Sequence, residues 1–123
     1  MKLRILRERF SVCKQPMDAV IDLHNPFTFV SRTDDELSLV CITENVPQSI
    51  IAREDGWKAF RIEGELDFGL VGILARIASI LAENSIPLFA VSIYNTDYVL
   101  VKEDRFEKAL YYLEQAGYEL QRN

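Results

Sequence analysis

Side chains that carry out catalysis or bind metals are scarce in this 123-residue chain. It has one histidine, His24, and two cysteines, Cys13 and Cys41. A structural zinc site usually needs four protein ligands, and nucleophilic catalysis needs a nucleophile beside a base. His24 precedes Asn25-Pro26 in a predicted loop, where a surface or turn residue is expected. The sequence therefore predicts no metal site, no cofactor and no catalytic residues, and we expect a protein that is not an enzyme.

An excess of positive charge and long apolar runs are also lacking. Fourteen basic residues against nineteen acidic ones give a formal net charge of −5, and the basic residues are scattered. Nucleic-acid binding needs a basic footprint, so this class of partner is disfavoured. No run approaches the roughly 20 apolar residues that cross a bilayer, and the first residues lack the apolar core of a signal peptide. Two cysteines are too few for a disulfide scaffold, so buried free thiols are favoured over a bridge. We expect a cytoplasmic protein without nucleic-acid or membrane partners.

The second half of the chain shows the clearest pattern, beginning with a strand and a helix. Residues 57–67 alternate between apolar and polar side chains, which predicts a strand. An apolar stripe at helical spacing follows, formed by Leu70, Ile73, Leu74, Ile77, Ile80 and Leu81. Asn84 can take the left-handed conformation of a helix end, and Pro87 forbids continuation. We therefore expect the helix to stop near Glu83.

A strand pair and a second helix are expected next. Residues 88–94 are apolar on both faces, which predicts a central strand covered on two sides, and a turn leads from it to a strand at 98–101. Asp104 is predicted to cap the second helix, Gly117 to end it, and residues 118–121 to form a closing edge strand. The order β-α-β-β-α-β is that of a ferredoxin-like α+β fold, an antiparallel sheet with both helices on one face.

The first half of the chain is less regular. Residues 3–6 and 10–14 have the pattern of two strands, and we expect a tight turn at residues 7–9 to join them. Residues 27–32 and 37–42 form a predicted hairpin. Between these strands we expect a loop without helical periodicity.

A weak internal echo links this hairpin to the later strand pair. Val30-Ser31 is followed after five residues by LSLV, and Val91-Ser92 after five by YVLV. In this match Glu36 falls where Asp97 falls, 61 residues later. On the pattern alone, chance and a true internal repeat both remain open as explanations of this match. If the repeat is true, the first half is a reduced copy that lost its first helix.

Several segments of the chain resemble a known protein family. The passage from Asp67 through Gly72-Ile73-Leu74 to Ile77 resembles the ACT domain, a small ligand-binding regulatory module. The segments GWKAFRIEGELDF, SLVC and VSIYNTDYVLVKED are similar to those of a compact bacterial group with two ACT-like units in about this length. The same ACT subtype occurs in arginine sensors of the CASTOR type and in some aspartate kinases. Four residues separate Asp67 from Gly72, more than in the usual ACT turn.

The resemblance implies a division into two units packed side by side. Residues 1–56 would form a reduced ACT-like unit, and residues 57–123 a complete ACT domain. It further implies an ability to form a homodimer, and a regulatory amino acid bound at an interface between ACT units.

Two places could bind the charged groups of an amino acid. The turn from Leu66 to Gly72 precedes a helix whose first N–H groups lack partners, so that a ligand carboxylate could dock there, or Asp67 or a water could cap the helix instead. Asp97 could hold the ammonium group, or could be a turn residue without a ligand. The candidate ligand-binding residues are Leu66, Asp67, Phe68, Gly69, Leu70, Val71, Gly72, Ser92, Tyr94, Asn95, Thr96 and Asp97.

Two functions therefore remain open on the sequence. The first is a non-enzymatic regulatory protein whose amino-acid ligand bridges the turn at residues 66–72 and a neighbouring ACT unit, which would shift a population of assemblies. The alternative is a structural or protein-interaction module without a ligand, which would associate through a sheet edge or a helix face.

Overall fold

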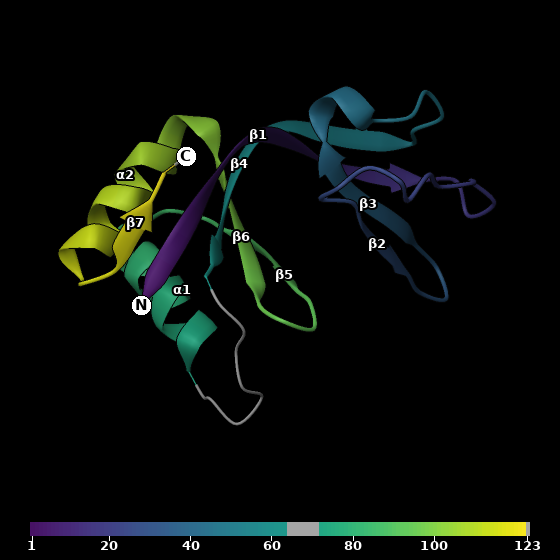
Figure 1. Cartoon of the computed structure of the whole chain (residues 1–123). Helices are drawn as coiled ribbons and strands as arrows, with labels where there is room; N and C mark the ends of the chain where they lie inside the picture. Colours follow the sequence, from purple (N-terminus) through teal and green to yellow (C-terminus); the bar gives the residue numbers. More distant parts are fainter. Residues whose placement is uncertain (64–71, 123) are drawn as a thin grey trace. The chain divides into compact units, whose positions relative to one another are not determined.

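The structure of this chain is a computed structural model that describes residues 1–63 and 72–122 (Figure 1). Within these residues the protein is an α+β protein with two α-helices. The predicted end of the strand at 57–67 and Leu70 of the helical stripe lie outside the described residues. In chain order the elements are β1 (Lys2–Gln15), β2 (Phe29–Arg32), β3 (Leu37–Ile42), the 3-10 helix η1 (Thr43–Asn45), β4 (Ala52–Ile62), α1 (Ile73–Glu83), β5 (Phe89–Ser92), β6 (Asp97–Lys102), α2 (Glu103–Gln115) and β7 (Glu119–Gln121).

The chain divides into two compact units. Unit 1 consists of Met1–Arg7 and Lys58–Asn123, and unit 2 of Glu8–Trp57. The strands β1 and β4 are long, and each contributes residues to both units. The first residues of the chain therefore belong to the same unit as its second half.

Unit 1 contains the order strand, helix, two strands, helix and strand, from β4 to β7. Its strands lie in the order β7-β1-β4-β6-β5, so that β1 separates the closing strand β7 from β4. β7 runs parallel to β1, with Lys2 opposite Glu119 and Arg4 opposite Gln121. The predicted closing strand is confirmed, and its neighbour in the sheet is the N-terminal strand.

The core of unit 1 lies between its strands and its two helices, which lie on one side of these strands (Figure 1). Its buried members recur every second residue on the strands and every third or fourth residue on the helices, as expected when each element buries one face. They are Leu3, Ile5, Phe60, Ile62, Ile77, Leu81, Ile86, Val99, Val101, Phe106, Ala109, Leu110, Leu113 and Tyr118. This packing holds the start of α1 and the end of α2 in place.

The apolar stretch 88–94 is not the central strand that its composition predicts. Among the described residues, β5 ends the strand order of unit 1, and its residues alternate between half-buried and exposed. Ile93 and Tyr94, at the end of the stretch, are 43% and 77% exposed. The strand buried on both faces is β6, where four successive residues from Tyr98 to Val101 are buried. Apolar composition predicts a strand, but its place in the sheet depends on which strands pair with it.

α1 ends at Glu83 as predicted, although the left-handed residue is a different one. Asn84 has φ −107°, whereas Ser85 has φ +58°. The Asn84 side chain donates a hydrogen bond of 2.8 Å from Nδ2 to the carbonyl oxygen of Ile80. Asn84 therefore satisfies an orphan carbonyl of the last turn, and the next residue takes the reversed conformation.

The predicted cap of α2 is wrong, because the helix begins one residue before Asp104. Its N-cap residue is Lys102, which makes no side-chain cap hydrogen bond, and Glu103 and Asp104 both lie in the first turn. Their negative charges lie at the positive end of the helix dipole, which is favourable without a cap. The predicted C-terminus is confirmed: Gly117 has φ +103° and follows the last residues of α2.

Unit 2 is built on the second half of β1. Its strands lie in the order β2-β3-β1-β4, and β3 is antiparallel to β1, with Gln15 opposite Leu37. The predicted hairpin of β2 and β3 is confirmed. The tight turn predicted at residues 7–9 is wrong, since β1 runs without a break for 14 residues. The three successive charged residues at 7–9 are compatible with a continuous strand when no glycine, proline or asparagine breaks it.

The hairpins of the two units have the same construction. In unit 2, Thr33 donates its backbone N–H to the carbonyl oxygen of Glu36, and in unit 1, Ile93 donates to Thr96, each at 2.9 Å. Phe29 and Phe89 begin the first strands of the two hairpins, 60 residues apart. The two hairpins therefore correspond at an offset of 60 rather than the 61 of the sequence match, and Glu36 corresponds to Thr96 rather than to Asp97.

Both cysteines are buried free thiols, as predicted. Cys13 and Cys41 form a small core cluster in unit 2 with Leu39. Burial raises the pKa of the Cys41 thiol to about 11, with a smaller contribution in the same direction from Cys13. The pKa of Cys13 is also raised by burial. Both thiols are therefore protonated at neutral pH.

Candidate functional site

The structure places the predicted ligand-binding residues in two groups. Residues Leu66 to Val71 lie outside the described part of the chain. Gly72 is the N-cap residue of α1, with φ 79° and ψ 5°, a left-handed conformation that glycine adopts without strain. The other five residues, from Ser92 to Asp97, lie on the hairpin between β5 and β6.

The hairpin residues differ in exposure and in partners. Ser92 lies opposite Asp97 at the mouth of the turn. Tyr94 is 77% exposed, and Asn95 is exposed beside it. Thr96 is buried and donates a hydrogen bond of 2.7 Å from Oγ1 to the carbonyl oxygen of Ile62. Thr96 thus contributes to the sheet itself, whereas Asp97 remains partly accessible.

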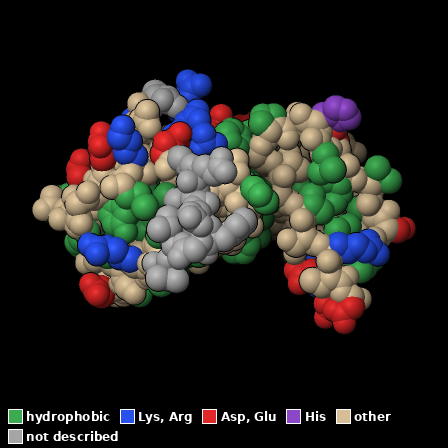
Figure 2. Space-filling model, turned by 60° about the horizontal axis from the view of Figure 1, so that its bottom comes forward, with side chains coloured by type: hydrophobic (Ala, Val, Ile, Leu, Met, Phe, Trp, Pro, Cys, Tyr) green, Lys and Arg blue, Asp and Glu red, His purple; other side chains and the backbone are tan. Residues whose placement is uncertain are grey.

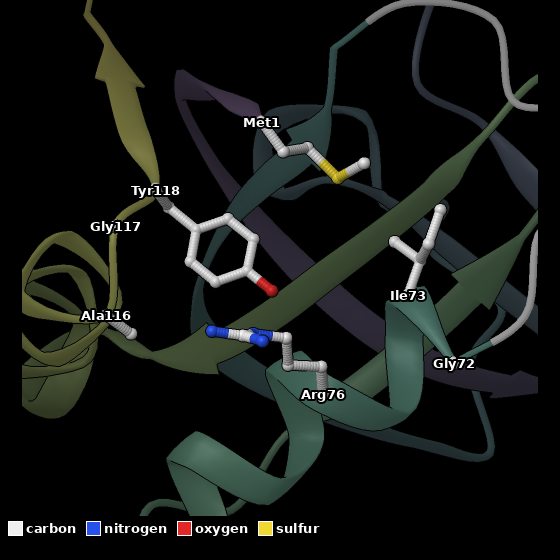
Figure 3. A pocket seen from close by; sticks show the side chains of 7 residues that line it. All are labelled: Met1, Gly72, Ile73, Arg76, Ala116, Gly117 and Tyr118. Carbon is white, nitrogen blue, oxygen red and sulfur yellow. The ribbon is translucent and has the colours of Figure 1, made fainter.

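A pocket of about 290 Å³ lies at the start of α1 (Figure 3). The side chains of Arg76, from α1, and Tyr118, which follows α2, point into it (Figure 3). Its lining consists of Met1, Gly72, Ile73, Arg76, Ala116, Gly117 and Tyr118. The pocket therefore draws on the residue before β1, the N-cap and first turn of α1, and the residues that follow α2, all within unit 1.

The electrostatics of this pocket favour an anion. The first N–H groups of a helix have no partners within the helix and carry its positive dipole end. Gly72 has no side chain to cap them, and the first turn of α1 contains no acidic residue. Arg76 places a guanidinium group one turn further along. Among the described residues that line the pocket, none has an acidic side chain.

The pocket and the hairpin are separate sites in unit 1, as far as the described residues show. Of the predicted ligand-binding residues that the structure describes, Gly72 is the one in the pocket lining, and neither Asp97 nor its hairpin neighbours are part of it. Sequence reasoning missed Arg76 and Tyr118. One signal was present, since Arg76 interrupts the longest apolar stretch of the chain.

Other polar groups offer less chemistry. His24, the one histidine, lies exposed at the surface (Figure 2), with its Nδ1 2.8 Å from Oδ1 of Asp22. The backbone N–H of His24, and secondarily its ring, lower the pKa of Asp22. In the described residues, no group of three or more His, Cys, Asp or Glu side chains could hold a metal ion. None of the described helices is long and apolar enough to cross a membrane.

Comparison with known families identifies the chain's relatives. A family model described as the ACT domain matches residues 52–115, slightly more than half of the sequence. The chain belongs to the ACT-domain family. A second family model, for an N-terminal domain, matches residues 8–49 of this ACT-domain protein. A search of the curated proteins finds no match.

Solved structures with a similar fold extend over nearly the whole chain. An Agrobacterium tumefaciens protein is 32% identical, with a TM-score of 0.88 over 99% of this chain and 92% of its own. A Vibrio cholerae protein of unknown function, described as a possible transport protein, is 20% identical, with a TM-score of 0.66 over 93% and 88% of the two chains. The aspartokinase alpha and beta subunits are 14% identical, with a TM-score of 0.65 over 94% and 97%. At the last two identities the likeness concerns the fold alone.

Proposed function

We propose that this ACT-domain protein is a non-enzymatic regulatory module that binds an amino acid at an interface between ACT units. The observation that carries the proposal is the pocket at the start of α1, with Arg76 inside it and no acidic side chain among the described residues of its lining. ACT domains in general are small-molecule regulatory domains, and an amino acid provides the carboxylate that such a pocket accommodates.

The carboxylate of the ligand would lie between the first N–H groups of α1 and Arg76. Both are positive, and an anion between them is stabilised by the helix dipole and by charge-assisted hydrogen bonds. Tyr118, which is 8% exposed, would contribute its hydroxyl as a further hydrogen-bonding group. The apolar atoms of Met1, Ile73 and Ala116 would then contact the ligand's aliphatic part.

The ammonium group would be bound by Asp97 of a neighbouring ACT unit. Asp97 is partly accessible at the start of β6, and it does not line the pocket of its own unit. We therefore assign it to a ligand held by a second copy of the chain. Such a ligand would bridge two units and stabilise the dimer over the monomer, which is how binding would be converted into regulation.

The proposed organisation is a tandem one, with a reduced ACT-like unit at residues 1–56 and a complete domain at 57–123. The common construction of the two hairpins and the strand order β2-β3-β1-β4 support this proposal. In unit 2 a loop follows β1 where α1 follows β4 in unit 1, and η1 follows β3 where α2 follows β6. Both differences agree with a copy whose helices were shortened or lost.

A thermal-shift screen of the twenty amino acids tests the proposal directly. A ligand that binds only the native state raises the melting temperature by mass action. We expect at least one amino acid to do so, and Arg76→Gln to abolish the shift. Lys108→Gln, an equal loss of charge at an exposed position of α2, should retain it. No shift with any of the twenty at millimolar concentration contradicts the proposal.

The role of Asp97 is tested by mixing two variants. Asp97→Ala should abolish the shift while leaving the melting temperature of the free protein nearly unchanged. In an equimolar mixture of Arg76→Gln and Asp97→Ala, mixed dimers contain one intact site, so part of the ligand response should return. If the mixture shows no ligand-induced thermal shift although both variants form dimers, Asp97 does not act from a neighbouring copy.

A second candidate function is a protein-interaction module without a ligand. The exposed Ile93 and Tyr94 beside the edge strand β5 favour it, since exposed apolar groups at a sheet edge can pair with another chain. Replacing both with Ser separates the two functions. A ligand response that survives the double replacement supports the amino-acid proposal, whereas loss of self-association without any ligand response supports the interaction module.

A further inference from the structure

Unit 1 contains a second pocket, of about 160 Å³, whose lining is rich in positive charge. Three basic side chains meet there from three parts of the unit: Arg7 from β1, Lys58 from β4, and Arg122, which follows β7. The α2 residues Phe106 and Glu107 also line the pocket. The pocket has no lining residue in common with the one at the start of α1.

Strand alternation explains why the basic side chains converge. Leu3 and Ile5 face the core of unit 1, so Arg7 lies on the same face of β1, two residues further along. By the same alternation Lys58 shares its face of β4 with Phe60 and Ile62. Arg7 and Lys58 therefore lie on the core-facing sides of their strands, at the edge of the core, where a charged group reaches solvent.

The ammonium group of Lys58 is held in place by two contacts. Its Nζ donates a hydrogen bond of 2.9 Å to the carbonyl oxygen of Arg7, and it lies 6.0 Å from the centroid of the Phe106 ring. Phe106 itself is buried in the core. A cation over an aromatic face is attracted by the ring, so the group is oriented before any ligand arrives. Two N–H groups of the ammonium remain for a further acceptor.

The charges in the lining do not balance. Glu107 is the one acidic residue among the described residues of the lining, and both of its carboxylate oxygens accept hydrogen bonds from Arg122, at 2.8 and 3.3 Å. In the part of the lining that the structure describes, the charges of Arg7 and Lys58 have no acidic counterpart. This local excess of two positive charges occurs in a chain with a net charge of −5.

We infer that this pocket binds the phosphate group of a small phosphorylated metabolite. A phosphate monoester carries close to two negative charges at neutral pH, which matches the two cations that have no acidic counterpart in the described lining. Its oxygens can accept hydrogen bonds from both Arg7 and Lys58. A carboxylate would neutralise one of these two positive charges. The pocket is large enough for the phosphate and leaves the rest of the metabolite outside. The inference does not depend on amino-acid binding at α1.

Glu107 has a defined part in this site, because it competes with the ligand for Arg122. While the Glu107–Arg122 pair persists, the guanidinium of Arg122 is turned to its own chain's carboxylate. Glu107→Gln removes the competing charge, so that three cations face the phosphate. The variant should therefore bind phosphate more tightly than the unmodified protein, a result that general damage to the fold would not produce.

The test measures binding of inorganic phosphate to the full chain by isothermal titration calorimetry, at constant ionic strength set with chloride. Arg7→Gln and Lys58→Met should each weaken binding about tenfold, the value of one charge-assisted hydrogen bond. Met retains an apolar stem over Phe106. Lys14→Gln, an equal loss of charge at an exposed position of β1 in unit 2, should leave binding unchanged. Glycerol phosphate, as a monoester, should bind with the same response to the variants.

Three results together support the inference. The affinity for phosphate falls with Arg7→Gln and Lys58→Met, rises with Glu107→Gln, and falls as the salt concentration is raised. Absence of saturable phosphate binding, or binding that Lys14→Gln weakens as much as Lys58→Met, overturns it. Unchanged melting temperatures verify that each variant is folded. The amino-acid response at α1 should persist in Lys58→Met, which keeps failure of this site distinct from failure of the other.

Discussion

The hydroxyl of Thr96 donates a hydrogen bond of 2.7 Å to the carbonyl oxygen of Ile62. This bond joins the turn between β5 and β6 to the last residue of β4. Both residues are buried, so neither group has ready access to water. The hairpin that carries Asp97 is thereby tied to the strand that leads toward α1, and Thr96 has a structural partner where the sequence suggested a ligand.

Thr96→Val should therefore destabilise unit 1. The substitution keeps the shape of the side chain and leaves the Ile62 carbonyl without this donor, which costs about 1–3 kcal/mol for a buried group. Urea denaturation monitored by circular dichroism measures the change in the free energy of unfolding. Thr96→Ser retains the hydroxyl and should lose less. Equal stability of the Val variant and the unmodified protein would show that the bond contributes little.

Gly72→Ala should lower stability without a steric clash. An added Cβ at Gly72 meets no atom within 4 Å in the described structure, so the cost comes from the left-handed backbone conformation alone, about 1–2 kcal/mol. Asn tolerates this conformation better, so Gly72→Asn should lose less. If urea denaturation gives Gly72→Asn a lower free energy of unfolding than Gly72→Ala, the backbone explanation is contradicted.

The buried thiols should make the protein sensitive to alkali. The folded state holds the Cys41 proton more tightly than the unfolded state, because its pKa is raised from 9.0 to about 11. The free energy of unfolding is therefore unaffected by this group below pH 9 and falls as the pH rises from about 9 to about 11. Denaturation midpoints across this range measure the decline, and Cys41→Ala should reduce its slope.

The same burial predicts slow thiol chemistry in the native protein. Cys13 and Cys41 are 3% and 2% exposed, and thiolate is the reactive form. At neutral pH a thiol reagent such as Ellman's should react with both cysteines only as fast as the protein opens, and rapidly in denaturant. Fast stoichiometric reaction of the native protein would contradict the buried position of both thiols.

Local patterns predicted local structure well. The apolar stripe before Glu83 and the conformational freedom of Gly117 placed the ends of both helices, because helix periodicity and chain reversal depend on neighbouring residues. The hairpins at β2-β3 and β5-β6 were found for the same reason. The start of α2 was placed two residues late, because Lys102, which is not a usual capping residue, occupies the N-cap position that Asp104 was expected to take.

The sequence by itself determined the α+β order of elements, the buried thiols and the resemblance to the ACT family, since each is a property of short segments. Only the tertiary structure decided that β1 separates β4 from β7, that β5 ends the strand order of the described residues, and that Arg76 and Tyr118 share a pocket with Gly72. It also brought Arg7, Lys58 and Arg122 together. Strand pairing joins residues far apart in the chain, and no local pattern specifies which partners they take.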